Sequence, residues 1–185
     1  MSPFVQYIPN ALSVSRIILS FCLIPAILGR HIVWAAVIFA AAAVSDFLDG
    51  HLARRFGVCS RWGALLDPLA DKTLMTISYL LFFAVGFIPL YVAAVVITRD
   101  VLILAAVGAC RLGGAAIKIE PSLSSKINTA VQMIFLVLVL ACKLLAMHVP
   151  YLLDLGAAVT SASTVYSGVE YVQKYRWIWS LLFRR

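Results

Sequence analysis

Residues 32–85 read IVWAAVIFAAAAVSDFLDGHLARRFGVCSRWGALLDPLADKTLMTISYLLFFAV, two apolar runs on either side of a basic turn. Each run has about twenty residues, which is the length that an α-helix needs to cross ~30 Å of hydrocarbon at ~1.5 Å per residue. The turn from Arg54 to Gly63 joins the runs as a short loop. The stretch therefore predicts a pair of antiparallel membrane-spanning helices.

The rest of the chain repeats this pattern, so that six apolar segments follow one another. Glycine and proline mark the other breaks, at Gly29–His31, Gly86–Pro89, Gly113–Pro121 and His148–Pro150. No linker or repeat divides the chain, and residues 1–185 are expected to form one domain, an all-α integral membrane bundle of six transmembrane helices. The expected spans are Ala11–Leu28, Ile32–Ala53, Leu65–Val85, Ile88–Cys110, Leu123–Leu145 and Leu152–Tyr171.

Composition excludes a water-soluble globule. Of the 185 residues, 63% are hydrophobic and 12% are charged, and the mean hydropathy is +1.01. A soluble domain carries about twice that charged fraction. The net charge of +7 would also suit nucleic acid. However, the basic residues gather in short segments between apolar runs, which favours anionic lipid head groups and argues against a nucleic-acid partner.

The distribution of lysine and arginine predicts the orientation of the bundle. With six spans, the N-terminal segment, the second and fourth loops and the C-terminus share a side. The opposite side has only Arg30 and Lys143 in or beside its loops. Because basic loops stay in the cytoplasm, both termini are expected there. The basic residues of the cytoplasmic side are Arg54, Arg55, Arg61, Arg111, Lys118, Lys126, Lys174, Arg176, Arg184 and Arg185.

Four of the eight acidic residues fall in the quoted stretch. Asp46 and Asp49 are three residues apart at the inner end of one helix, and Asp67 and Asp71 are four apart at the inner end of the next. Both spacings bring side chains to one helical face. Clustered carboxylates repel unless a cation lies among them, and hard oxygen ligands select Mg²⁺, Mn²⁺ or Ca²⁺ rather than a soft metal. Two such ions would suit phosphoryl transfer.

Other interpretations of these aspartates remain open. They would neutralise arginines at the membrane interface, although this does not account for two pairs in helical register. Intramembrane carboxylates also mark the ion path of a metal-ion or proton-coupled transporter, but a transporter would spread polar residues through the depth of the bilayer. Asp67-Pro68 suits a helix start as well, with Asp67 as N-cap and Pro68 in the first helical position.

The full pattern from Asp46 to Asp71, D-x2-D-G-x2-A-R-x8-G-x3-D-x3-D, resembles the signature of the CDP-alcohol phosphotransferases. These six-helix membrane enzymes transfer a substituted phosphate from a cytidine diphosphate donor to an alcohol and release CMP. The resemblance implies that Asp46, Asp49 and Asp67 ligate two metal ions, with Asp71 as a further ligand or the general base. It also implies a CDP pocket lined by Gly50, Ala53, Arg54 and Gly63.

Segments outside the motif indicate the acceptor. Ile8–Arg16 resembles the opening of two branches of the family, the phosphatidylglycerophosphate synthases and the mitochondrial-type cardiolipin synthases. Thr98–Leu102 and Pro121–Gln132 resemble the cardiolipin synthases, because Asp100 and Asn128 stand where the other branch usually has Glu and Lys. The resemblance therefore implies transfer from CDP-diacylglycerol to phosphatidylglycerol, with glycerol-3-phosphate as the alternative acceptor.

Five ionisable residues are candidates for the acceptor site. Arg99 and Asp100 lie in an otherwise apolar span, where such residues are costly and usually face the protein interior. A structural ion pair with a neighbouring helix is the competing interpretation. Arg111, Lys126 and Arg16 lie near helix ends, where each either receives an anionic head group or extends to interfacial water. The resemblance further implies a homodimer in a bacterial or mitochondrial inner membrane, with the active site on the cytoplasmic side.

Overall fold

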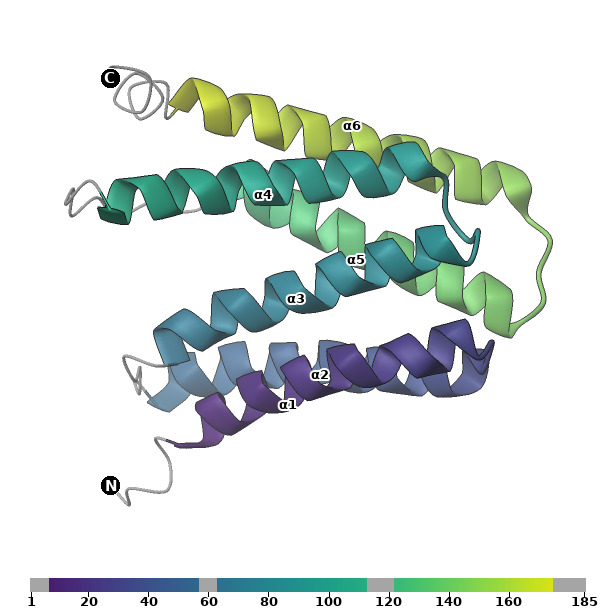
Figure 1. Ribbon diagram of the computed structural model, residues 1–185, viewed down its shortest axis with the longest axis horizontal. Helices are drawn as coiled ribbons and strands as arrows, with labels where there is room; N and C mark the ends of the chain where they lie inside the picture. Colours follow the sequence, from purple (N-terminus) through teal and green to yellow (C-terminus); the bar gives the residue numbers. More distant parts are fainter. Residues whose placement is uncertain (1–6, 57–62, 113–121, 175–185) are drawn as a thin grey trace. The chain divides into compact units, whose positions relative to one another are not determined.

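The computed structural model describes the backbone of residues 7–56, 63–112 and 122–174, and the side chains of 13–45, 70, 72–105 and 122–174. In these ranges the regular structure is helical and includes no strand, which confirms the predicted all-α class. The helices are α1 (Tyr7–Leu28), α2 (Ile32–Phe56), α3 (Gly63–Ala84), α4 (Leu90–Leu112), α5 (Leu123–Leu144) and α6 (Pro150–Lys174) (Figure 1).

The helices are separated by the breaks that the sequence predicts, but some boundaries differ. α1 begins at Tyr7 rather than Ala11, and α2 continues to Phe56. α3 begins at Gly63 rather than Leu65, so the additional interpretation of Asp67-Pro68 as a helix start is wrong. Pro68 lies in the second turn instead, where its missing N–H removes one helical hydrogen bond but does not end the helix.

Three helices, α1, α3 and α5, end in the same type of C-cap. Just past α3, Gly86 has a φ of 73°, and its N–H donates to the carbonyl three residues back at 2.9 Å. The N–H of Phe87 donates to the carbonyl five residues back at 2.8 Å. Arg30, with a φ of 55°, and Ala146, with a φ of 51°, hold the same place after α1 and α5. This Schellman geometry satisfies open carbonyls, and its left-handed residue favours glycine.

The described chain forms two compact units, and the first contains α1, α2, α3 and the last turn of α5. α1 packs along both α2 and α3 (Figure 1). The middle of α2 is a run of alanines from 40 to 43, and small side chains let two helix backbones approach closely. α1 is therefore the common neighbour of the two helices that carry the aspartates. Core side chains of this unit include Leu23, Ile27, Ala35, Phe39, Leu74, Met75, Tyr79 and Phe82.

The second unit contains α4, most of α5 and α6. α4 packs along α6 (Figure 1). Gly156 of α6 lies against Phe135 of α5, where an added Cβ would lie only 2.8 Å from the ring of Phe135. A side chain at this position would force the ring of Phe135 to shift, which favours glycine there. Core side chains of this unit include Val92, Val96, Leu136, Val139 and Ala157.

Among the described helices, α5 is the one that is both long enough and apolar enough to cross a membrane. The apolar stretches of described residues in α1, α2 and α3 are shorter, Ser13–Leu28, Ile32–Ser45 and Lys72–Ala84. The six-span bundle, the orientation of its ends and the single domain thus stay predictions.

The described side chains include several polar groups in the apolar core and many large apolar groups on the surface. Arg99 and Asp100 are 4% and 3% exposed, and Gln132 is fully buried. Large apolar side chains lie on the surface instead, with Trp34 65% and Ile134 66% exposed. A soluble protein buries its apolar side chains and leaves charged ones in water. Buried ionisable side chains together with exposed large apolar ones are typical of helices in a membrane.

The C-caps predict opposite effects of two substitutions on the free energy of unfolding. Gly86→Ala should lower the free energy of unfolding by about 1 kcal/mol, because a side chain is disfavoured in the left-handed region. An added Cβ at Gly86 meets nothing within 4 Å, so the effect is one of backbone conformation. Ala146→Gly, at the matched position after α5, should raise it by up to about 1 kcal/mol. Thermal unfolding in detergent measures both, and shifts of the same sign would contradict this assignment.

Candidate functional site

The two aspartate pairs lie on two helices of the first unit. Asp46 and Asp49 lie on α2, and Asp67 and Asp71 lie on α3, each helix being unbroken across its pair. The spacings of three and four residues therefore bring each pair to one helical face, as the sequence predicts. Figure 1 shows the end of α2 and the start of α3 at the same end of this unit, with α1 packed along both helices.

The side chains of the motif lie outside the described residues. This holds for the four aspartates and for the residues of the predicted CDP pocket, Gly50, Ala53, Arg54 and Gly63. Among the side chains that are described, no three His, Cys, Asp or Glu come together as a metal site. Metal binding and CDP binding by the motif thus stay predictions, supported by the helical register of the backbone.

A buried arginine connects the three helices of the second unit. Arg99 of α4 donates from Nη1 to Oδ1 of Asp100 at 2.8 Å, and both side chains of this ion pair are 4% exposed. Its Nη2 donates to Oγ of Ser125 on α5 at 2.5 Å and to Oγ of Ser167 on α6 at 3.0 Å. One carboxylate and two hydroxyls from three helices therefore hold the guanidinium in a single orientation.

The competing interpretation, in which Arg99 forms a structural ion pair with a residue of a neighbouring helix, is wrong about the partner. The carboxylate comes from the next residue of the same helix, and the neighbouring helices contribute serines. Adjacent residues of a helix do not face each other, but the long arginine side chain can turn back to the Asp100 carboxylate. Spacing along the sequence could not reveal this partner.

A second polar group joins α5 to α6 without any charge. Oδ1 of Asn128 accepts from Oγ of Ser163 and from Oγ1 of Thr164, at 2.9 Å each. Oγ1 of Thr164 accepts in turn from Nε2 of Gln132 at 3.0 Å. Asn128, Gln132 and Thr164 are at most 1% exposed. These bonds engage the amide oxygen of Asn128 and the amide nitrogen of Gln132, polar atoms that would be costly to bury alone.

The sequence prediction did not include Ser125, Gln132, Thr164 or Ser167 among the site residues. Their spacing contained the signal, since Ser125 and Gln132 are seven residues apart on α5, and polar residues recur on α6 at 160, 164 and 167. A polar stripe of this period in an apolar helix marks a face that contacts other helices.

The other predicted acceptor residues differ in the burial of their side chains. Arg16 belongs to the first unit and is fully buried, so its side chain does not extend to interfacial water. Lys126 is exposed in the first turn of α5. Oγ of Ser122 caps that turn by accepting from the N–H of Ser125 at 3.3 Å. Arg111 lies in the last turn of α4, and its side chain lies outside the described residues.

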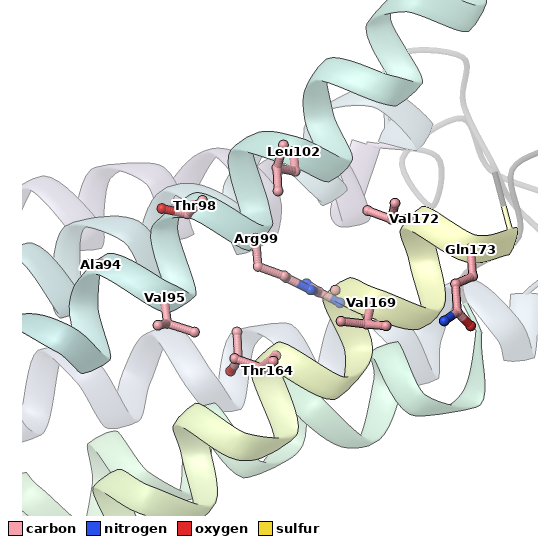
Figure 2. A pocket seen from close by; sticks show the side chains of 11 residues that line it. Ala94, Val95, Thr98, Arg99, Leu102, Thr164, Val169, Val172 and Gln173 are labelled. Carbon is pink, nitrogen blue, oxygen red and sulfur yellow. The ribbon is translucent and has the colours of Figure 1, made fainter. Parts of the chain in front are cut away.

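A groove runs between α4 and α6 in the same unit. It has a volume of about 490 Å³, and Figure 2 shows the side chain of Arg99 reaching from α4 toward α6 along it. Most of its lining is apolar. Residues of α4 at its wall are Ala94, Val95, Thr98, Arg99 and Leu102. Residues of α6 are Thr164, Val165, Gly168, Val169, Val172 and Gln173.

The family model described as CDP-alcohol phosphatidyltransferase matches residues 6–169. The chain belongs to the CDP-alcohol phosphatidyltransferase family. The match includes the whole Asp46–Asp71 motif of the first unit and the Arg99 cluster of the second. This membership confirms the family resemblance and supports an enzyme rather than the transporter considered as an alternative. Divalent metal ions are typical of the family, in agreement with hard carboxylate ligands.

Three similar proteins belong to the two branches that the sequence suggests. A cardiolipin synthase (CMP-forming) of Rattus norvegicus is 34% identical over 186 residues, and one of Homo sapiens is 33% identical over 186 residues. Each alignment covers 90% of this chain and 62% of the relative. A probable phosphatidylglycerophosphate synthase of Mycobacterium tuberculosis strain H37Rv is 33% identical over 149 residues, which cover 79% of this chain and 66% of that protein.

The Arg99 cluster makes a ranked stability prediction. Asp100→Asn should lower the free energy of unfolding by about 3 kcal/mol, because the buried guanidinium loses its counter-charge. Ser167→Ala should cost about 1 kcal/mol, since one neutral hydrogen bond is lost. Asp154→Asn changes an exposed aspartate of α6 in the same way and should have almost no effect. Unfolding in detergent ranks the three, and an Asp100→Asn protein as stable as Asp154→Asn would refute the role of the pair.

Proposed function

We propose that the protein transfers a phosphatidyl group from CDP-diacylglycerol to phosphatidylglycerol, which yields cardiolipin and CMP. The similarity to CMP-forming cardiolipin synthases over 90% of this chain carries the proposal. The chain spans 62% of the length of these two relatives, so the activity is inferred from the shared part. The family's aspartate motif is complete in this chain, from Asp46 to Asp71.

The four aspartates fit a divalent metal site in chemistry and in helical register. Carboxylate oxygens are hard ligands, and each pair shares a face of an unbroken helix. We assign Asp46, Asp49 and Asp67 to hold two ions, Mg²⁺ or Mn²⁺, with Asp71 as a further ligand. When bound, such ions supply positive charge to the pyrophosphate of the donor.

The remaining roles belong to the residues of the motif and to the substrates. Gly50, Ala53 and Gly63 leave room for the cytidine diphosphate, and Arg54 binds phosphate oxygens. Asp71 accepts the proton of a glycerol hydroxyl of phosphatidylglycerol. That hydroxyl oxygen forms a bond to the phosphorus that bears diacylglycerol, and the bond from this phosphorus to the CMP oxygen breaks. The chemistry therefore needs mainly positioning and one general base.

The second unit supplies residues for the acceptor. Arg99 is a permanent cation held rigidly by Asp100, Ser125 and Ser167, and a fixed guanidinium suits recognition of a phosphate. Arg16, Arg111 and Lys126 are further cations for an anionic acceptor. These three residues are included because they are positively charged and because the sequence predicts them on the cytoplasmic side of the membrane.

We further propose that the six helices span a membrane as one bundle, with both termini and the active site on the cytoplasmic side. The buried polar and exposed apolar side chains support this location, as does the basic bias of the predicted cytoplasmic loops. The membrane would be the inner membrane of a bacterium or of a mitochondrion. A homodimer completes the proposal, since exposed apolar helix faces allow association within the bilayer.

Removal of the general base tests the mechanism. Asp71→Asn should lower the rate of CMP release by about 100-fold or more with Mg²⁺ or Mn²⁺ present, because no carboxylate then accepts the hydroxyl proton. Asp154→Asn is the control, since Asp154 is exposed on α6 and lies outside the motif. The rate is measured with purified protein in detergent or liposomes and without any ion gradient. An Asp71→Asn enzyme that keeps the wild-type rate would refute the assigned role.

The identity of the acceptor has its own experiment. Phosphatidylglycerophosphate synthase is the alternative activity, and the similarity to the mycobacterial protein of that probable function favours testing it. Labelled CDP-diacylglycerol is supplied with either phosphatidylglycerol or glycerol-3-phosphate, and the lipid product is identified. We expect labelled cardiolipin with the first acceptor and no phosphatidylglycerophosphate with the second. The opposite pattern would move the protein to the other branch of the family.

A further inference from the structure

One donor of the Arg99 guanidinium lacks an acceptor. Nη1 donates to Asp100, and Nη2 donates to both Ser125 and Ser167. Nε is buried, and none of the described residues accepts a hydrogen bond from it. A buried N–H group without an acceptor is costly, and folded proteins rarely leave one in that state. An oxygen atom of a ligand would satisfy this donor.

The two serines at Nη2 differ in exposure. Ser167 of α6 is 1% exposed, whereas Ser125 is half-buried in the first turn of α5. The cluster is therefore open on the side of Ser125, and an incoming group can take the place of that hydroxyl at Nη2. Nε and Nη2 form one edge of the planar guanidinium, and such an edge matches two oxygens of a phosphate. Release of Ser125 would thus complete a two-point phosphate site.

Asp100 and Ser167 hold the guanidinium after such an exchange. Asp100 supplies the counter-charge from α4, and Ser167 supplies a buried acceptor from α6. Figure 2 shows the Arg99 side chain directed from α4 toward α6. A free arginine side chain samples many rotamers, and fixing it costs conformational entropy. A guanidinium that is already fixed at two nitrogens avoids that loss when a ligand binds.

We infer that Ser167 is a positioning residue for acceptor recognition. It keeps the Nε edge of Arg99 aligned for the phosphodiester of the acceptor lipid, which displaces Ser125 from Nη2. The inference rests on the transfer to phosphatidylglycerol proposed above. Loss of Ser167 should weaken acceptor binding, because its buried position is closed to solvent and the guanidinium can then rotate. Loss of Ser125 should not weaken binding, because the phosphate replaces that hydroxyl.

Nuclear magnetic resonance of the Nε–H group tests the contact directly. The protein carries ¹⁵N-labelled arginine in detergent micelles without CDP-diacylglycerol, and the Arg99 signal is assigned by its absence in Arg99→Lys. Phosphatidylglycerol should shift this signal in a saturable way. Diacylglycerol with the same acyl chains lacks the phosphate and should leave the signal unchanged. Inorganic phosphate at equal concentration should also leave it unchanged, which distinguishes a lipid site from a general anion site.

Serine-to-alanine variants separate positioning from stability. Ser167→Ala should raise the dissociation constant for phosphatidylglycerol about fivefold, the effect of one neutral hydrogen bond. Ser125→Ala should leave that constant the same or lower it. Ser163→Ala is the matched control, because it removes a hydroxyl of α6 that bonds to Asn128 rather than to Arg99. Ser163→Ala and Ser167→Ala should lower the free energy of unfolding by similar amounts, so that only the affinity distinguishes their roles.

CMP release by the same proteins gives the kinetic counterpart. Ser167→Ala should raise KM for phosphatidylglycerol about fivefold and leave both kcat and KM for CDP-diacylglycerol within about twofold of the wild type. A fall in kcat at unchanged KM, or an equal loss of affinity in Ser163→Ala, would reduce Ser167 to a structural role and overturn the inference. An Nε signal that ignores phosphatidylglycerol, or that responds equally to inorganic phosphate, would overturn it as well.

Failure of the proposed function would look different. A wild-type protein whose Nε signal responds to phosphatidylglycerol, but which releases no CMP from the two substrates, would refute the transfer reaction and keep the lipid contact. A wild-type protein that forms cardiolipin while its Nε signal stays unchanged would refute the contact and keep the function.

Discussion

The second unit is organised by the need to neutralise one buried cation. A guanidinium cannot lose its charge, and its transfer from water to an apolar interior is costly unless carboxylate and hydrogen-bond partners surround it. Arg99 meets this need with Asp100 from its own helix and with serines from α5 and α6. The three helices are therefore connected at one point by directional bonds. Close packing elsewhere in the unit, as at Gly156, sets the distance between two helices. It does not supply the directional bonds that fix how each helix is rotated about its axis.

The uncharged network on α5 and α6 extends the same principle. Asn128, Gln132 and Thr164 turn toward one another because an amide or hydroxyl on an apolar surface would lack partners. Their bonds fix which face of each helix points inward. The opposite faces present valine, leucine and isoleucine to the surroundings. The unit thus buries these polar groups beside apolar core side chains such as Leu136 and Val139, and its surface is rich in apolar side chains.

The first unit has a different organisation, which suits the motif it carries. α1 packs on α2 and α3 through small and apolar side chains, such as the alanines of α2. The positions of the four aspartates in the chain are toward the C-terminal end of α2 and the N-terminal end of α3. Apolar packing thus positions two helices whose ends carry negative charge, and a divalent cation would remove the repulsion between them. The family match covers both units, and with them the aspartate motif and the Arg99 cluster.

The sequence by itself determined the all-α class, the breaks between helices, the aspartate register and the family. These features depend on local patterns, namely apolar run length, turn residues and spacings of three or four residues within a helix. The additional interpretation of Asp67-Pro68 as a helix start is wrong, because a proline in the second turn resembles one in the first.

Only the tertiary structure decided the partners of Arg99, the burial of Arg16 and the groove at Gly168. Each depends on which faces of separate helices meet, and Ser125 and Ser167 lie 26 and 68 residues from Arg99 in the chain. No spacing within one helix encodes such a meeting.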